Sequence, residues 1–428
     1  NYDSRMTTFS RLSPLFLVAL GFGCTSEVPR EGTSPSSVGA ASGLFSADSA
    51  VADWVDAGRV TGAVLRVTRG GEVEWEQSYG FAERFDFGVG QYPPSFDAAA
   101  PGAGLSGLPT PVPMTVATVF DLASVTKVMA TTMAMMVLTD RGDIDLEAPV
   151  SRYLTDFAGG GKEAITITHL LTHRSGLEQW KPTYYHADNA DEAYAYIREL
   201  PLAWTPGAER HYSDFGFILL GRIVEHVSGK PLNDFVADEV YTPLGLRTTG
   251  YLPTRGPYAT TSHGNPFERR MVYEADFGYQ IEGDPTAWDD WREYSLTGEV
   301  NDGNAHHAFG GVAGHAGLFS TASDLSVLLE LLLDDGRHGD GAFISDDVID
   351  RFLATTGNDQ ALGWQNPPYA LEGSFGHTGF TGTFVMGVPS QDLAIVLLTN
   401  RQNGGVDAGG EYPDVGTLQR AVVEALTR

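Results

Sequence analysis

A hydroxyl and an amine lie three residues apart in a stretch that is otherwise apolar. The stretch FDLASVTKVMATTMAMMVL runs from Phe120 to Leu138 and contains Ser124 and Lys127. It predicts a buried helix, on which residues three apart share one face. A serine becomes a nucleophile when a base takes its proton, and a lysine that burial keeps neutral can be that base. Because the free N–H groups at a helix start favour developing negative charge, the spacing predicts an acylation site.

Two other polar segments could complete such a site, since S-x-x-K alone occurs by chance in many helices. In HYSDFGFILLGRI, Tyr212 and Asp214 precede a predicted helix. A tyrosine near a serine–lysine pair can pass a proton to a leaving group. In FGHTGFTGTFVM, His377, Thr378 and Gly379 open a predicted strand. Small residues there allow a substrate backbone to lie along the strand edge, whose N–H can complete an oxyanion hole. The structural alternative for the second segment is a tight turn.

The elements around these segments predict an α+β fold. A helix from Ala47 to Ala57 precedes a β-hairpin that turns at Gly70-Gly71, and the middle of the chain is helical. Two strands around Pro389 to Asp392 and a last helix follow. This order predicts an antiparallel sheet flanked by helices, with an inserted helical domain. Further expected elements are a loop or ordered excursion over Phe85 to Pro113, a helix in Ile165 to Leu177 that Gly176 ends, a helix over Phe215 to Gly229 and irregular chain over Tyr251 to Asn304.

Together, the three polar segments resemble the serine penicillin-recognising superfamily. It includes class C-type β-lactamases, D-Ala-D-Ala carboxypeptidases and family VIII carboxylesterases, and carries S-x-x-K, Tyr-x-Asn or Ser-x-Asn, and Lys/His-Thr-Gly in this order. The stretches FDLASVTKVMATT and GEVNDGNAHHAFGGVAGHAGLFS look closest to penicillin-binding protein 4B-like serine hydrolases. The resemblance covers the chain from about Ser46 to its end and implies the β-lactamase/transpeptidase-like form of the α+β fold.

The resemblance also implies roles for individual residues. Ser124 would be the nucleophile, Lys127 its base or an aid to its deprotonation, and Tyr212 a proton shuttle. The N–H groups of Ser124 and Phe380 would form the oxyanion hole. The implied substrate-binding residues are Asp214, His315, His377, Thr378, Gly379 and Phe380.

Two departures from the superfamily pattern bear on the substrate. Asp214 replaces the usual Asn and adds a charge that only accepts hydrogen bonds. It could hold Lys127 protonated, which would leave Tyr212 as the better base. His377 replaces the Lys common in β-lactamases, and a neutral histidine binds a carboxylate less firmly. The His377 departure disfavours β-lactam turnover and leaves room for esters. Without a class A-type glutamate, the hydrolytic water would be activated by Tyr212.

The remaining histidines predict no metal site. His169 and His173 have the i, i+4 spacing of a zinc motif but lack its intervening glutamate, so we expect them to be structural. His306, His307 and His315 cluster without supporting ligand spacing. We expect His315 to line the cleft, and we expect neither a metal nor a cofactor.

Composition and the N-terminal segment predict an exported protein. The 428 residues carry a net charge of −28, which disfavours nucleic acid as a partner. Residues 1–24 are predicted to contain an export signal, and residues 1–5 lie upstream of the expected initiator methionine. The only cysteine in the sequence, Cys24, directly follows the apolar core of this signal. This placement resembles a lipoprotein signal, with an ordinary cleaved signal or a free thiol as alternatives. Residues 25–46 predict a flexible linker and residues 47–428 the hydrolase domain.

The sequence therefore predicts an exported serine hydrolase, periplasmic or on the outer surface, that forms an acyl-enzyme at Ser124. The leading substrate is the D-Ala-D-Ala end of peptidoglycan stems or a small ester. Membrane contact is expected only through the N-terminal lipid. The alternatives are a class C-type β-lactamase and a penicillin-binding sensor with slow turnover.

Overall fold

The computed structural model describes residues 30–32, 38–87, 105–274, 279, 281, 283–357, 359–407 and 409–428. The predicted export signal with Cys24 and part of the predicted linker lie outside these residues, as do residues 88–104 of the predicted excursion. In the described part of the chain, no helix combines the length and apolar character that a membrane crossing needs.

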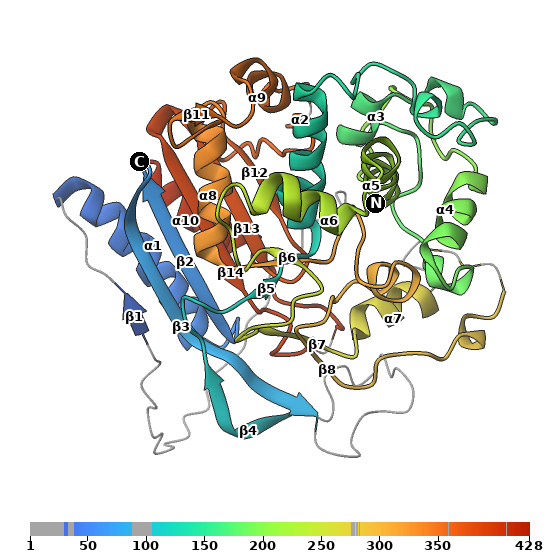
Figure 1. Ribbon diagram of the computed structural model, residues 1–428. Coiled ribbons are helices and arrows are strands. Elements are labelled where there is room, and N and C mark those ends of the chain that lie inside the picture. The colour runs from blue at the N-terminus through green and yellow to red at the C-terminus, as the bar shows by residue number, and fades with distance from the viewer. Residues whose placement is uncertain are drawn as a thin grey trace.

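A seven-stranded antiparallel sheet forms the backbone of the fold (Figure 1), and its strand order is β1-β3-β2-β14-β13-β12, with β4 paired to β3. These strands are β1 (Arg30–Gly32), β2 (Gly62–Arg69), β3 (Glu72–Phe87), β4 (Leu105–Pro113), β12 (Phe375–Thr378), β13 (Thr383–Val388) and β14 (Leu393–Thr399). The predicted hairpin is confirmed: β2 pairs with β3, and Gly70 and Gly71 both have positive φ, as a tight two-residue turn requires.

Helices cover both faces of this sheet because its central strands are apolar on both sides. Every residue of β14 is buried, and alternate side chains enter two different cores. Leu397 packs with α1 (Val38–Asp56) and α10 (Gly416–Leu426) on one face. Leu398 packs with α8 (Ala322–Leu333) on the other face (Figure 1).

The helical part of the chain lies between β4 and β12 in the sequence, and its buried side chains share one core with α8. Figure 1 shows most of its helices to the right of the large sheet. Its helices are α2 (Met133–Asp140), α3 (Ile167–Leu171), α4 (Ala190–Glu199), α5 (Asp214–Ser228), α6 (Leu232–Val236), α7 (Pro266–Tyr273) and α9 (Asp346–Leu353). Its short strands are β5 (Phe120–Asp121), β6 (Gly250–Tyr251), β7 (Thr260–His263), β8 (Ser295–Thr297), β9 (Leu318–Ser320), β10 (Arg337–His338) and β11 (Gly341–Ala342). The predicted α+β architecture with a helical insertion is confirmed.

Several predicted boundaries differ from the structure. The first helix begins at Val38, inside the predicted linker, and α3 ends at Leu171, well before Gly176. The irregular segment from Tyr251 to Asn304 contains short strands and α7. Such ends are set by contacts with remote segments, for example the pairing of β7 with β8.

The stretch from Phe120 to Leu138 is not one regular helix. It begins as β5, makes a 3-10 turn at Ala123–Val125, continues as a π-helical turn at Lys127–Thr132 and becomes regular at α2. Irregular helical turns of this kind are frequent at functional sites.

Candidate active site

Ser124 lies in a strained turn that a buried carboxylate holds. Ala123, directly before it, has a φ of 46°, a left-handed conformation that is costly for a residue with a Cβ. The carboxylate of Asp121 accepts hydrogen bonds from the N–H groups of Ala123 (2.9 Å) and Asn301 (2.6 Å). Burial raises the pKa of Asp121 to about 6. Sequence reasoning missed this residue, although it precedes Ser124 by only three positions.

Lys127 contacts the serine from the next turn. Its side chain is 0% exposed, and its Nζ donates a hydrogen bond to Ser124 Oγ at 3.0 Å. The same Nζ lies 2.7 Å from Asp214 Oδ1 and donates to the carbonyl oxygen of His315 at 3.1 Å. Three segments remote in sequence therefore meet at one ammonium group.

The charge of Lys127 follows from these contacts. Burial by itself lowers a lysine pKa and is the largest single influence, but the interactions with Asp214 and Tyr212 together outweigh it, and the pKa of Lys127 lies above its ordinary value. The expectation that burial would neutralise the lysine is wrong for this environment. The alternative expectation, that Asp214 keeps Lys127 protonated, agrees with the ion pair.

Tyr212 lies beside the lysine, with its ring centroid 5.0 Å from Lys127 Nζ. Burial raises the pKa of its hydroxyl, and the positive charge of Lys127 only partly offsets this effect. The phenol is therefore neutral at neutral pH and is suited to donate a proton. This state does not favour Tyr212 as the resting base.

His173 is a neighbour of Tyr212 that sequence reasoning assigned a structural role. Its ring centroid lies 4.4 Å from that of Tyr212, and its Nδ1 accepts a hydrogen bond from Ser213 N–H at 3.1 Å. Burial holds the pKa of His173 well below its ordinary value. A neutral imidazole thus orients the segment carrying Tyr212, whereas His169 caps α3. The i, i+4 spacing of His169 and His173 does not predict the contact between His173 and Tyr212.

His315 lies in the same cluster, with its side chain bound to a second carboxylate. His315 Nε2–H donates to Asp302 Oδ1 at 3.0 Å, and both groups are close to Asp214, since one ligand atom from each of the three lies within 4.8 Å of the others. Burial alone would raise the pKa of Asp302, but His315 lowers it to about 2. These three side chains could ligate a cation. However, the Lys127 ammonium already lies at Asp214 and would repel a metal ion.

The second wall of the site is β12 with the turn that follows it. His377 and Thr378 pair with β13, opposite Val385 and Phe384. Two threonine hydroxyls tie this region to the serine turn: Thr381 Oγ1 donates to Asp121 O (2.7 Å) and Thr383 Oγ1 to Leu122 O (2.9 Å). A Cβ on Gly379 would collide with the carbonyl oxygen of Leu122. The glycine thus permits the close approach of the two walls.

The His377 side chain is neutral and only 2% exposed. Its Nδ1–H donates to the carbonyl oxygen of Thr378 at 2.7 Å, and burial together with Lys127 lowers the pKa of His377 to about 3. The imidazole is therefore unable to provide a positive charge for a substrate carboxylate at neutral pH.

The aromatic ring of Phe380 packs against Phe267, with ring centroids 5.1 Å apart, and the Phe380 carbonyl accepts a hydrogen bond from Arg401 Nε (2.8 Å). The oxyanion role of the Ser124 and Phe380 N–H groups stays a prediction.

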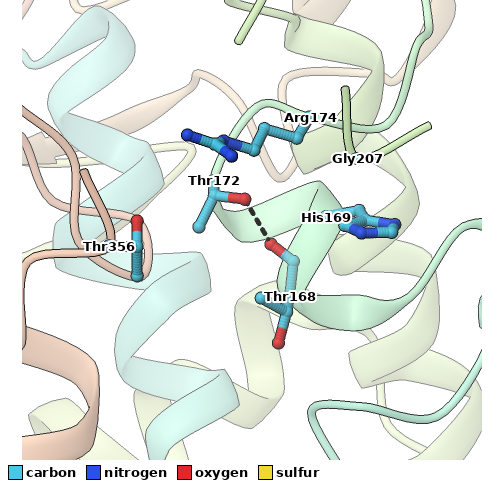
Figure 2. Close-up of a pocket in the computed structure, with 6 residues that line it drawn as sticks. All are labelled: Thr168, His169, Thr172, Arg174, Gly207 and Thr356. Carbon is cyan, nitrogen blue, oxygen red and sulfur yellow. Dashed lines mark hydrogen bonds between the residues drawn. The ribbon is translucent and has the colours of Figure 1, made fainter. Parts of the chain in front are cut away.

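A cavity of about 170 Å³ lies outside this cluster (Figure 2). Its lining residues are Thr168, His169, Thr172, Arg174, Gly207 and Thr356, of which Thr172 donates a hydrogen bond to the Thr168 carbonyl at 2.7 Å. None of the predicted catalytic or substrate-binding residues lines this cavity. The candidate active site is therefore defined by the side-chain contacts around Ser124.

The site contains a serine in a strained turn that is hydrogen-bonded to a buried lysine, with a tyrosine and a sheet edge beside it. These features define a serine hydrolase of the acyl-enzyme type. The chain belongs to the β-lactamase family, whose model, described as "Beta-lactamase", matches residues 47–416.

Two relatives are similar over most of their length. The "N-acetylmuramyl-L-alanine amidase" of Bacillus subtilis (strain 168) is 32% identical over 401 residues, which are 85% of this chain and 85% of the relative. A "Putative D-alanyl-D-alanine carboxypeptidase" of Escherichia coli O157:H7 is 28% identical over 391 residues, or 85% and 84% of the two chains.

Solved structures share the fold. A family VIII carboxylesterase superposes with a TM-score of 0.65 at 21% identity, over 93% of this chain and 99% of that one. A penicillin-binding protein homologue from Caulobacter crescentus superposes with a TM-score of 0.65 at 19% identity, over 92% and 98%. At these identities the likeness concerns the fold.

Proposed function

We propose that this serine hydrolase cleaves an amide bond in peptidoglycan stem peptides through an acyl-enzyme on Ser124. The contact between Ser124 Oγ and the Nζ of a fully buried lysine, at 3.0 Å, carries this proposal. It sets a nucleophile and a proton-handling group side by side. The names of the two relatives support a wall-peptide substrate.

In this mechanism the Ser124 oxygen attacks the substrate carbonyl, and Tyr212 donates a proton to the leaving amine. The raised pKa of Tyr212 suits it to that donor role. Water then attacks the acyl-enzyme, and Ser124 leaves as the hydroxyl. The N–H groups of Ser124 and Phe380 are proposed to hold the oxyanion in both halves of the reaction.

The bond that is cleaved has two candidates. The sequence favours the terminal D-Ala–D-Ala bond, and similarity to the amidase adds the bond between muramic acid and L-Ala. Both bonds lie outside the cytoplasm in the wall polymer, so the proposal agrees with the predicted export of the chain. Esters and β-lactams are alternative acyl donors for the same serine.

One synthetic substrate tests both candidates. N-acetylmuramyl-pentapeptide ending in D-Ala-D-Ala contains both bonds, and mass spectrometry distinguishes loss of D-Ala from release of the whole stem. We expect one of these products with the wild type and none with Ser124→Ala. Ser390→Ala, which changes an exposed serine in the turn between β13 and β14, serves as the matched control. An intact substrate with the wild type, or equal turnover by Ser124→Ala, would contradict the proposal.

Benzylpenicillin in a parallel reaction separates the alternatives. A lasting adduct of one penicillin on Ser124 would favour a peptidase or sensor with slow deacylation. Rapid loss of the antibiotic without an adduct would favour a β-lactamase.

A further inference from the structure

Lys127 has no lone pair available to take the serine proton. An ammonium group carries three N–H donors. Lys127 Nζ donates hydrogen bonds to Ser124 Oγ at 3.0 Å and to the His315 carbonyl at 3.1 Å, and it forms an ion pair with Asp214 Oδ1 at 2.7 Å. The adjacent tyrosine is a neutral phenol. The resting site therefore holds two proton donors beside the nucleophile, and acylation requires an acceptor for the serine proton.

Asp214 is placed to be that acceptor. It is the first residue of α5, and its N–H donates to the Gln179 carbonyl at 3.0 Å, which fixes the start of the helix beside the lysine. Lys127 lies between its carboxylate and Ser124, so two linked proton transfers connect the serine to Asp214. Its side chain is only 17% exposed, so water competes little for the charge.

Asp302 is a second carboxylate that favours proton movement from Ser124 toward Asp214. A carboxylate oxygen of Asp302 lies within 4.8 Å of one from Asp214, and its pKa of about 2 keeps it ionised. The field of this second negative charge favours movement of a positive charge away from Ser124 and toward the two aspartates. Its hydrogen bond to His315 holds it in place.

We propose that Asp214 is the terminal acceptor of the Ser124 proton and that Lys127 relays this proton. As Ser124 Oγ bonds to the substrate carbonyl carbon, its proton passes to Lys127 Nζ while another proton of Nζ passes to Asp214. The carbonyl π pair moves to the oxyanion, Lys127 stays an ammonium and Asp214 becomes a carboxylic acid.

The second half of the step returns the proton. When the tetrahedral intermediate collapses, the C–N bond breaks and the leaving nitrogen takes the proton of the Tyr212 hydroxyl. Tyr212 is then reprotonated by Lys127, which recovers its proton from Asp214. The net transfer is from Ser124 to the leaving group, and Asp214 acts on the reacting atoms only through Lys127.

This inference rests on the proposed acyl-enzyme function and has a test of its own. In Asp214→Asn the amide can still accept a hydrogen bond but cannot accept the proton at neutral pH. We expect kcat/KM for p-nitrophenyl butyrate and for the peptide substrate to fall about 10²-fold or more, with most of the loss in kcat. Asp214→Glu, which keeps a carboxylate, should recover part of the rate.

The dependence of the acylation rate on the D₂O content of the solvent separates a relay from a structural role. Acylation rates in mixtures of H₂O and D₂O should give a curved proton inventory for the wild type, because two protons move together, and a more linear one for Asp214→Asn. Asp347→Asn, which removes an exposed aspartate from the first turn of α9, is the matched control and should keep the wild-type rate. Circular dichroism melts establish that each variant is folded.

Whether Asp214→Asn lowers or raises the rate decides between the relay and the alternative. If Asp214 only holds Lys127 in an inactive charged form, Asp214→Asn frees the lysine as a base and the rate at neutral pH rises, which overturns the relay. An unchanged rate overturns it as well. Failure of the proposed function is distinct, because the wild type itself would then form no acyl-enzyme on Ser124.

Discussion

The two walls of the active site differ in how they treat charge. On the wall that contains Ser124, Lys127 lies between the serine and Asp214, with Asp302 and His315 behind them. On the opposite wall, the His377 imidazole is buried and neutral. Both walls are built around buried polar side chains, yet the first holds the charged Lys127 and Asp302, whereas the second holds a neutral histidine.

The difference has a physical cause in the partners available to each group. Burial disfavours the charged form of both Lys127 and His377. Lys127 has a carboxylate 2.7 Å away, whereas Nδ1–H of His377 donates to a backbone carbonyl, and Lys127 itself opposes a positive charge on His377. Charge is therefore concentrated around Ser124, and the sheet wall presents a neutral imidazole.

The largest effect is expected on the charged wall, from removal of the Tyr212 hydroxyl. Tyr212→Phe keeps the ring beside Lys127 and His173 but removes the hydroxyl that we propose as the proton donor to the leaving group. We expect kcat for the peptide substrate to fall by about 10²–10⁴, with a smaller change in KM.

Tyr369→Phe is the matched control for this loss, because Tyr369 packs against the sheet core near α1 and α10. Steady-state kinetics of both variants test the assignment. A fall of less than twofold for Tyr212→Phe would remove the hydroxyl from the mechanism.

A smaller but still large effect is expected where the two walls touch. Gly379→Ala places a Cβ against the Leu122 carbonyl, two residues before Ser124, and should push β12 away from the serine turn. Misplacement of about 1 Å can cost about 10²-fold in rate, and overpacking costs about 1–3 kcal/mol of unfolding free energy.

Gly341→Ala tests whether an added methyl group alone accounts for these losses, since its Cβ would meet no atom within 4 Å. Rates of acylation and urea unfolding would be measured for both variants. If Gly379→Ala behaves like Gly341→Ala, the contact between the walls is not needed for activity.

The smallest effect on activity is expected from a change at His377. Its main effect is expected on the free energy of unfolding as a function of pH. The pKa of His377 is about 3 in the folded chain and about 6.5 in an unfolded one. Between these values the unfolded chain binds one more proton, so this group removes stability as pH falls from 6.5 toward 3. His377→Asn should cancel that contribution.

We expect the two proteins to differ in how steeply the free energy of unfolding changes with pH. Between pH 6 and 4, the unfolding free energy of His377→Asn should improve relative to wild type by up to about 1.4 kcal/mol per pH unit. Urea titrations at a series of pH values measure this difference, in which contributions from Asp121 and the other shifted groups largely cancel. Parallel pH dependences of the two proteins would mean that His377 is protonated in the folded state.

Much of the fold followed from local patterns, and the missed parts depend on distant segments. The hairpin at Gly70-Gly71 was predictable because two glycines between alternating strands permit a tight turn. The irregular course of Phe120 to Leu138 was not, since its apolar composition also suits a regular helix. Its turn is held by Asp121, whose carboxylate bonds to Asn301 from another part of the chain.

The sequence by itself determined which side chains could do chemistry. Ser124 and Lys127 are three residues apart, so almost any helical turn brings them together, and Tyr212 and His377 stand in segments of distinctive composition. Only the tertiary structure decided their protonation states and neighbours. Asp214, His315 and His173 reach the site from separate segments, and a pKa depends on burial and on charges a few ångströms away rather than on spacing along the chain.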